Sequence, residues 1–97
     1  MASKIDEITI NFEENGVQVV KELDKAILTK GAWSTIMFKY QDLDRKTEMF
    51  GPVKYVIRRY RKTNDEYRSQ SKFNISGRDQ AQKVIDVLQG WLAESDE

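Results

Sequence analysis

Residues 53–76 constrain the fold of this chain more than any other stretch. They read VKYVIRRYRKTNDEYRSQSKFNIS, in which β-branched, aromatic and basic residues flank a short polar segment at 63–66. Apolar and polar residues that alternate with a period of two are typical of strands, and Asn and Asp favour tight turns. The stretch therefore predicts two antiparallel strands, 53–62 and 67–75, joined by a turn.

The alternation assigns the side chains of this hairpin to two faces. One face is apolar, and we expect a helix to cover it; its members are Tyr55, Ile57, Tyr67, Phe73 and Ile75. The opposite face is polar and basic, and we expect it to stay open; its members are Lys54, Arg58, Tyr60, Arg68 and Lys72.

A helix is predicted directly after the hairpin. Ser76 is a suitable cap, and Asp79 follows three residues later in an approximate capping box. Apolar residues then recur with the spacing of one helical face, and this stripe consists of Ala81, Val84, Ile85, Leu88, Trp91 and Leu92. We expect the stripe to pack on the sheet.

Upstream of the hairpin the pattern predicts further strands. Residues 33–42 (WSTIMFKYQD) are rich in β-branched and aromatic residues. Residues 8–12 (ITINF) alternate, and Asn15-Gly16 after them favours a hairpin that returns at 17–20.

The segments between these strands are less strongly patterned. Residues 21–31 fit either a helix or a turn at 22–25 followed by a strand at 26–29, and we favour the strand. Residues 43–52 predict a charged connection that ends at Gly51-Pro52.

Together these elements predict one α+β domain over residues 1–97. We expect a twisted antiparallel sheet of four to six strands, followed by one C-terminal helix packed on one face. The core should span about 8–93, with flexible ends at 1–6 and 94–97. No apolar run approaches the length of a membrane span, and cysteine is absent, so we expect a cytoplasmic protein without disulfides.

The residue types needed for most catalysis are missing. The chain has no histidine and no cysteine, so the usual general base, zinc ligands and thiol nucleophile are absent. Its glycines are isolated, which argues against a phosphate-binding loop, and the acidic residues at 42–44 and 65–66 lack the spacing of a calcium loop. We therefore expect no enzymatic activity, no metal and no cofactor.

Charge is segregated along the chain although the formal net charge is zero. Residues 38–76 hold ten Lys/Arg and five Asp/Glu, whereas the remainder holds six and eleven. Such cations either protect the edges of a sheet or contact phosphates, with aromatic side chains stacking on bases. The composition alone leaves both interpretations open.

Three short motifs in the second half of the chain bear on this choice. They are Val56-Ile57-Arg58-Arg59-Tyr60, Lys72-Phe73-Asn74-Ile75-Ser76 and Gly77-Arg78-Asp79-Gln80, within a strand-rich stretch over 26–92 that ends in a helix. In this order they resemble the transcriptional coactivator family known as positive cofactor four, whose plan the Whirly proteins share. The resemblance implies a homodimer that binds single-stranded DNA across its sheets, with helices in the dimer contact.

The resemblance also suggests roles for individual positions. Arg58 matches the family's strand arginine, and Lys72 lies close to its basic run. Arg61 stands where the family has an aromatic residue.

We therefore expect a dimeric, sequence-tolerant protein that binds single-stranded nucleic acid and acts like a coactivator or in genome maintenance. The resemblance favours DNA as the ligand and leaves RNA open. Phosphates would be contacted by Lys39, Lys54, Arg58, Arg59, Arg61, Lys62, Arg68 and Lys72. Bases would stack on Trp33, Tyr40 and Tyr60. The alternative is a protein-interaction module that uses the open face or a sheet edge. No membrane partner or small-molecule substrate is expected.

Overall fold

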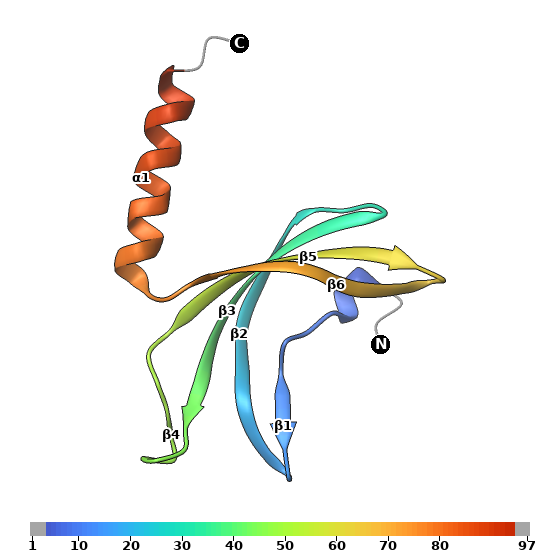
Figure 1. Cartoon of the computed structure of the whole chain (residues 1–97), viewed down its shortest axis with the longest axis vertical. Helices are drawn as coiled ribbons and strands as arrows, with labels where there is room; N and C mark the ends of the chain where they lie inside the picture. Colours follow the sequence, from blue (N-terminus) through green and yellow to red (C-terminus); the bar gives the residue numbers. More distant parts are fainter. Residues whose placement is uncertain (1–3, 95–97) are drawn as a thin grey trace.

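The computed structural model describes residues 4–94, which form a strongly twisted antiparallel sheet followed by one helix (Figure 1). The elements in chain order are a 3-10 helix at Ile5–Glu7, β1 (Phe12–Glu14), β2 (Val17–Thr29), β3 (Trp33–Asp44), β4 (Met49–Phe50), β5 (Lys54–Thr63), β6 (Glu66–Ile75) and α1 (Arg78–Glu94). The strands lie in the order β1-β2-β3-β5-β6, with β4 paired to the end of β3. The predicted α+β class, and a sheet that precedes a single helix, are confirmed.

Two tight turns fix the hairpins at the places the sequence predicts. Asn15 and Gly16 both have positive φ, 54° and 81°, and so do Asn64 and Asp65, at 51° and 64°. Two consecutive residues with positive φ are the signature of the turn whose twist matches that of paired strands, and Asn, Asp and Gly adopt it with the least strain. The hairpins β1–β2 and β5–β6 follow.

The segment that fitted either a helix or a turn belongs to one long strand. β2 runs without interruption from Val17 to Thr29, and the predicted turn at 22–25 is wrong. The pairing with β3 shifts between Glu22 and Asp24, and again between Ile27 and Thr29. These bulges absorb the extra residues, so that Glu22, Lys25 and Ile27 all point to the same face as the even-numbered residues of β3.

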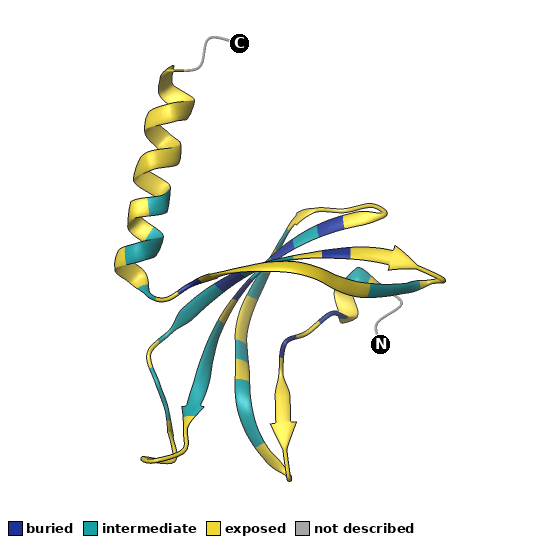
Figure 2. Cartoon of the chain, viewed as in Figure 1, coloured by how far each residue is buried: buried dark blue, intermediate teal, exposed yellow. Residues whose placement is uncertain are grey.

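The hydrophobic core lies on one face of the sheet, which we call the inner face. It contains Ile36, Phe38, Val56 and Tyr60, all buried. The N-terminal segment, residues 5–11, crosses this face and buries two isoleucines, Ile8 and Ile10, against it, with Ile5 packed alongside (Figure 2). Each buried isoleucine contributes roughly 1.5–3 kcal/mol. The N-terminal segment thus closes the core.

The alternation predicted a strand over residues 8–12, but residues 8–11 do not belong to a strand, and β1 begins only at Phe12. The segment is held instead by side chains of β2. The Nζ of Lys25 donates to the carbonyl oxygens of Asp6 and Ile8 at 2.8 and 2.6 Å. The carboxylate of Glu22 accepts hydrogen bonds from Thr9 Oγ1 at 2.7 Å and from the backbone N–H of Ile10 at 3.2 Å.

The helix does not pack on the sheet, contrary to the prediction. No residue of α1 is buried, and α1 makes no extensive contact with any strand (Figures 1 and 2). Most of its apolar stripe is exposed, up to 72% at Leu92, whereas Ala81 and Val84 in the first turns are half-buried. The extended shape of the molecule is consistent with a helix that stands away from the sheet. Its radius of gyration is 15.7 Å, whereas a compact chain of this length has about 13 Å.

The capping box at the start of α1 is completed by Gln80, whereas the sequence suggested Asp79. Gln80 Oε1 accepts hydrogen bonds from the backbone N–H of Ser76 at 2.7 Å and from its Oγ at 3.0 Å. This side chain takes the place that the sequence suggested for Asp79.

The assignment of the two sheet faces was largely reversed. The face expected to lie beneath the helix, with Tyr55, Ile57 and Phe73, is the open one, which we call the outer face. The face expected to be open, with Arg58 and Tyr60, is the inner face that the N-terminal segment covers.

A β-bulge in the last hairpin causes a second error of assignment. Arg59 pairs with Ser71, but Tyr60 pairs with Ser69, so Gln70 is an extra residue on β6. As a result Tyr67 turns to the inner face and Arg68 to the outer face, the opposite of the simple alternation.

Candidate nucleic-acid interface

The outer face is built from rows of residues that face one another across β3, β5 and β6. The row at the hairpin tip contains Trp33, Arg61 and Arg68, and the next contains Thr35, Arg59 and Ser71. A third row is apolar and consists of Ala26, Met37, Ile57 and Phe73. Basic and aromatic side chains therefore meet at one end of an open sheet face.

We call Trp33, Arg59, Arg61 and Arg68 the Trp–Arg cluster. The guanidinium carbons of Arg59 and Arg61 lie 4.7 and 5.4 Å from the centroid of the Trp33 ring, within the range of cation–π interactions. The ring is 42% exposed, and the three arginines are exposed as well. The cluster presents positive charge and an aromatic surface to solvent together.

The loop before Trp33 is held by hydrogen bonds from three directions. Ser34 Oγ donates to the carbonyl oxygen of Gly31 at 3.0 Å, and Tyr67 Oη lies 3.5 Å from the same oxygen. The backbone N–H of Lys62 donates to the carbonyl oxygen of Ala32 at 2.8 Å. Gly31 has a φ of 137°, a conformation that side chains disfavour. These bonds position the tryptophan over β5.

Like charges face each other across β5 and β6. Arg61 is directly opposite Arg68 on the outer face, and Arg58 is directly opposite Lys72 on the inner face. Directly opposed like charges destabilise a sheet by a few tenths of a kcal/mol to about 1 kcal/mol. Arg68 is partly offset by Glu66, 3.4 Å away, but both side chains are exposed and the ion pair is weak. An anionic ligand would relieve the repulsion.

Six of the predicted site residues lie on the inner face instead, namely Tyr40, Lys54, Arg58, Tyr60, Lys62 and Lys72. Tyr60 is only 5% exposed, beneath the N-terminal segment, and has no free ring face for a base. Tyr40 and Arg58 are half-buried, and Lys72 is exposed at the edge. The prediction that Tyr60 stacks on a base is therefore wrong for this structure, because Ile8 and Ile10 fill the space above it.

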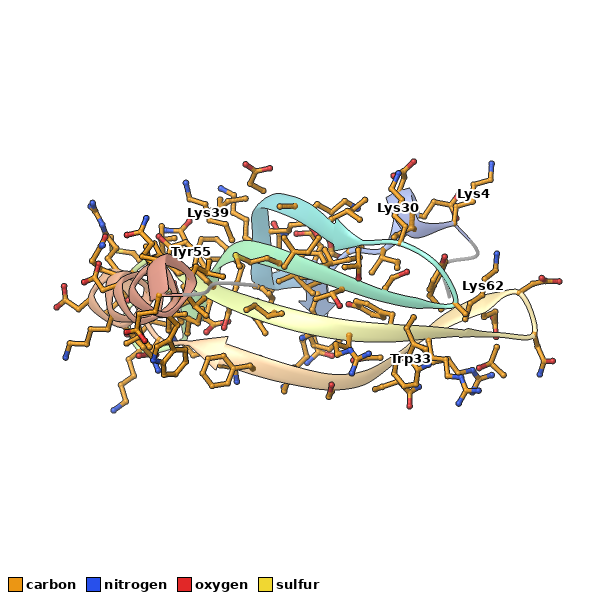
Figure 3. The ribbon with its side chains drawn as sticks, turned by 90° about the horizontal axis from the view of Figure 1, so that it is seen from above. Lys4, Lys30, Trp33, Lys39, Tyr55 and Lys62 are labelled. Atoms are coloured by element: carbon orange, nitrogen blue, oxygen red, sulfur yellow. The ribbon has the colours of Figure 1, made fainter. Side chains whose placement is uncertain are left out.

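Three lysines that were predicted to contact phosphates also lie apart from the Trp–Arg cluster. Lys54 Nζ lies 3.1 Å from the carboxylate of Asp42, in a half-exposed ion pair. Lys62 lies on the side of the sheet opposite Trp33, and its Nζ is 5.5 Å from the centroid of the Tyr67 ring (Figure 3). Lys39 lies opposite Tyr55 of β5, toward the end of the sheet away from Trp33 (Figure 3).

One aromatic residue of the open face was missed in the sequence. Phe73 was assigned to the core, but it is 53% exposed. It lies opposite Ile57 in the apolar row, next to the row that contains Arg59 and Ser71. The alternation placed it correctly on the face of Ile57. It could not indicate that the helix leaves this face uncovered.

Burial also affects the two tyrosines of the inner face. It raises the pKa of Tyr60 above 10.0, and the nearby guanidinium of Arg58 offsets part of this shift. The pKa of Tyr40 is raised as well, by burial first and then by the carboxylate of Asp42. Both phenols therefore stay protonated at neutral pH.

Within residues 4–94 no group of three or more acidic side chains gathers in a way that would hold a metal ion. Over the same range, the helical segments are too short or too polar to cross a membrane. Comparisons of the chain with protein-family models, with curated proteins and with solved structures find no match.

Proposed function

We propose that this protein binds single-stranded nucleic acid, with DNA as the ligand that the resemblance favours, through the Trp–Arg cluster of its outer face. The observation that carries the proposal is the exposed side chain of Trp33 beside Arg59 and Arg61, at the end of the outer face where these side chains are open to solvent. Single-strand binding requires cations for the phosphates and flat surfaces for the bases, and both are present here.

The geometry suggests how a strand would lie. The arginines would contact successive phosphates, and unpaired bases would stack on Trp33, on a guanidinium plane or on Phe73 in the third row. Each stacked base contributes roughly 1–3 kcal/mol. Contacts to phosphates and ring faces do not depend on base identity, which favours sequence-tolerant binding.

We further propose that the binding form is a homodimer in which α1 contacts a second copy. The exposed apolar stripe of α1 has no partner within the described chain, and patches of this kind mark interaction sites. The accessible surface of the chain is 7270 Å², whereas a compact monomer of 11.4 kDa exposes about 5,800 Å². The excess exceeds the roughly 800 Å² that each partner buries in a standard interface.

The resemblance to positive cofactor four agrees with both parts of this proposal. It predicts a dimer formed partly by helices, with single-stranded DNA on the sheets, and by the same likeness a coactivator-like role. Residues of the matching motifs, Arg58 and Lys72, lie on the inner face, so we assign the strand contacts to Arg59, Arg61 and Arg68 instead.

A double variant, Arg59→Ala with Arg61→Ala, tests the proposed interface. Losing two charge-assisted phosphate contacts should weaken oligo(dT) binding at least about tenfold, measured as fluorescence anisotropy of a labelled oligonucleotide. Lys46→Ala with Lys83→Ala removes the same charge from exposed positions elsewhere and should have a much smaller effect. Equal losses in the two double variants would contradict the assignment to the Trp–Arg cluster.

A second candidate function is the binding of another protein, and the apolar row of Ala26, Met37, Ile57 and Phe73 beside the arginines favours it. A partner that buries this row would depend on Phe73 more than on Arg59. Its binding would survive the double arginine variant and would be lost in Phe73→Ser, the reverse of the order expected for oligo(dT).

A further inference from the structure

The inner face holds a second concentration of positive charge, at a cavity that the Trp–Arg cluster does not share. Arg58 and Lys72 are direct cross-strand partners on β5 and β6. Both line a cavity of about 420 Å³ between the N-terminal segment and the sheet. Side chains of directly opposed residues start only about 5 Å apart, so the two cations converge on the same space.

One atom of this pair has no partner in the described chain. The Nε of Arg58 is buried and makes no hydrogen bond with any of residues 4–94. A buried donor without an acceptor costs about 1–3 kcal/mol, and more when the group is charged. The structure therefore has a buried guanidinium Nε–H without an acceptor and a cross-strand pair of like charges at the same place.

Two acidic side chains of the inner face already have an ion-pair or hydrogen-bond partner. Asp42 is the one carboxylate that lines this cavity in the described part of the chain, and its oxygen is 3.1 Å from Lys54. The carboxylate of Glu22, further along the inner face, accepts two hydrogen bonds from the N-terminal segment. Asp42 carries one negative charge against the two positive charges of Arg58 and Lys72 that line the same cavity.

A second cavity, of about 510 Å³, lies next to this one, since Arg58 and Thr9 line both. The second cavity is bordered by Tyr60, Tyr67 and Ser69, which offer ring surface and hydroxyl groups. Glu7 also borders this second cavity, away from Lys72. The combined space suits a ligand with one anionic end and one flat or polar end.

We infer that this groove binds a phosphate monoester, with the phosphate between Arg58 and Lys72 and the remainder of the molecule beside Tyr60 and Tyr67. A phosphate monoester carries about −1.5 to −2 charges at neutral pH, which match the two cations, Arg58 and Lys72, that line one cavity. A carboxylate or a phosphodiester carries a single charge and would leave the pair partly unbalanced. The site is separate from the proposed strand-binding surface and does not depend on it.

Phosphate monoesters have two sources, free nucleotides and the phosphorylated end of a strand. The probes are therefore dTMP, with thymidine as the phosphate-free control, and oligo(dT) with and without a 5′-phosphate, titrated calorimetrically. A free nucleotide as ligand gives saturable dTMP binding without thymidine binding. A strand end as ligand gives tighter binding of the 5′-phosphorylated oligonucleotide than of its 5′-hydroxyl form.

Lys72→Ala is the decisive variant, because Lys72 is exposed and its loss should leave the fold intact. We expect the phosphate-dependent binding to weaken at least about tenfold in this variant, as for the loss of one charge-assisted contact. Arg58→Gln should weaken it as well. The Arg59→Ala, Arg61→Ala variant should retain the phosphate-dependent binding.

Two outcomes would overturn the inference. One is that neither dTMP nor the 5′-phosphate adds any binding to the wild-type protein. The other is that Lys72→Ala leaves such binding unchanged. Loss of oligo(dT) binding in the Arg59, Arg61 variant concerns the Trp–Arg cluster alone, so the two proposals fail independently.

Discussion

Tyr60 is the residue at which the N-terminal segment changes the chemistry of the sheet most. Burial makes its phenol harder to ionise, so the folded protein holds the proton more tightly than the unfolded chain does. The corresponding stability is complete below about pH 10 and is lost as the pH rises through the folded-state pKa.

We therefore expect the free energy of unfolding to fall more steeply above about pH 10 in the wild-type protein than in Tyr60→Phe. Urea denaturation at a series of pH values measures the difference. Parallel profiles for the two proteins would show that Tyr60 ionises as it does in the unfolded chain.

The sequence predicted the strands and turns better than it assigned individual residues to the two faces of the sheet. Trp33, Arg59 and Arg61 were assigned to the binding surface and lie together on the open face. Arg68 reached the same face only because of the bulge at Gln70. A bulge is a register change between two strands, and Ser69-Gln70-Ser71 carries no residue that marks it.

The N-terminal segment is the element that stabilises the sheet most directly, since Ile8 and Ile10 close its core. Ile10→Ala removes a buried side chain and should lower the free energy of unfolding by about 2–5 kcal/mol. Leu28→Ala, at a half-exposed position of β2, should cost less than about 1 kcal/mol. Chemical denaturation of the two variants makes the comparison, and equal costs would contradict the role of the segment as a core element.

The N-terminal segment also shows why the sequence predicted where strands lie better than it predicted which segments cover them. Alternation at residues 8–12 fits a paired strand, and it fits equally well a segment that lies across a sheet with two isoleucines pointing inward. The second arrangement forms because the apolar residues of β3 and β5 provide a surface for Ile8 and Ile10 to pack on. Likewise, the stripe of α1 reveals which helix face is apolar but not which chain covers it. The turns at Asn15-Gly16 and Asn64-Asp65 were predictable because their backbone conformation is a local requirement.

At the scale of the whole molecule, the exposed helix suggests assembly. Leu88→Glu places a charge in the apolar stripe of α1 and should convert a dimer to a monomer, measured by light scattering after size exclusion. The cooperative unfolding of the sheet should persist, because no residue of α1 is buried in the single chain. Gln89→Glu adds the same charge one residue later, at an exposed polar position, and should leave the dimer intact.

A dimer in the Leu88→Glu variant, or a monomeric wild-type protein, would contradict the assembly role of α1. Either result would leave the Trp–Arg cluster untouched, since its residues belong to β3, β5 and β6.

The salt dependence of oligo(dT) binding tests the central proposal most directly. Each phosphate neutralised on a single strand contributes about −0.7 to the slope of log K against log salt concentration, so the three arginines of the cluster predict a slope of about −2 per protomer. The titration follows tryptophan fluorescence, because the ring of Trp33 would contact the bases. We expect micromolar or tighter binding at about 50 mM salt that weakens along this slope. No binding at that salt concentration, or binding that is independent of salt, would contradict the proposal.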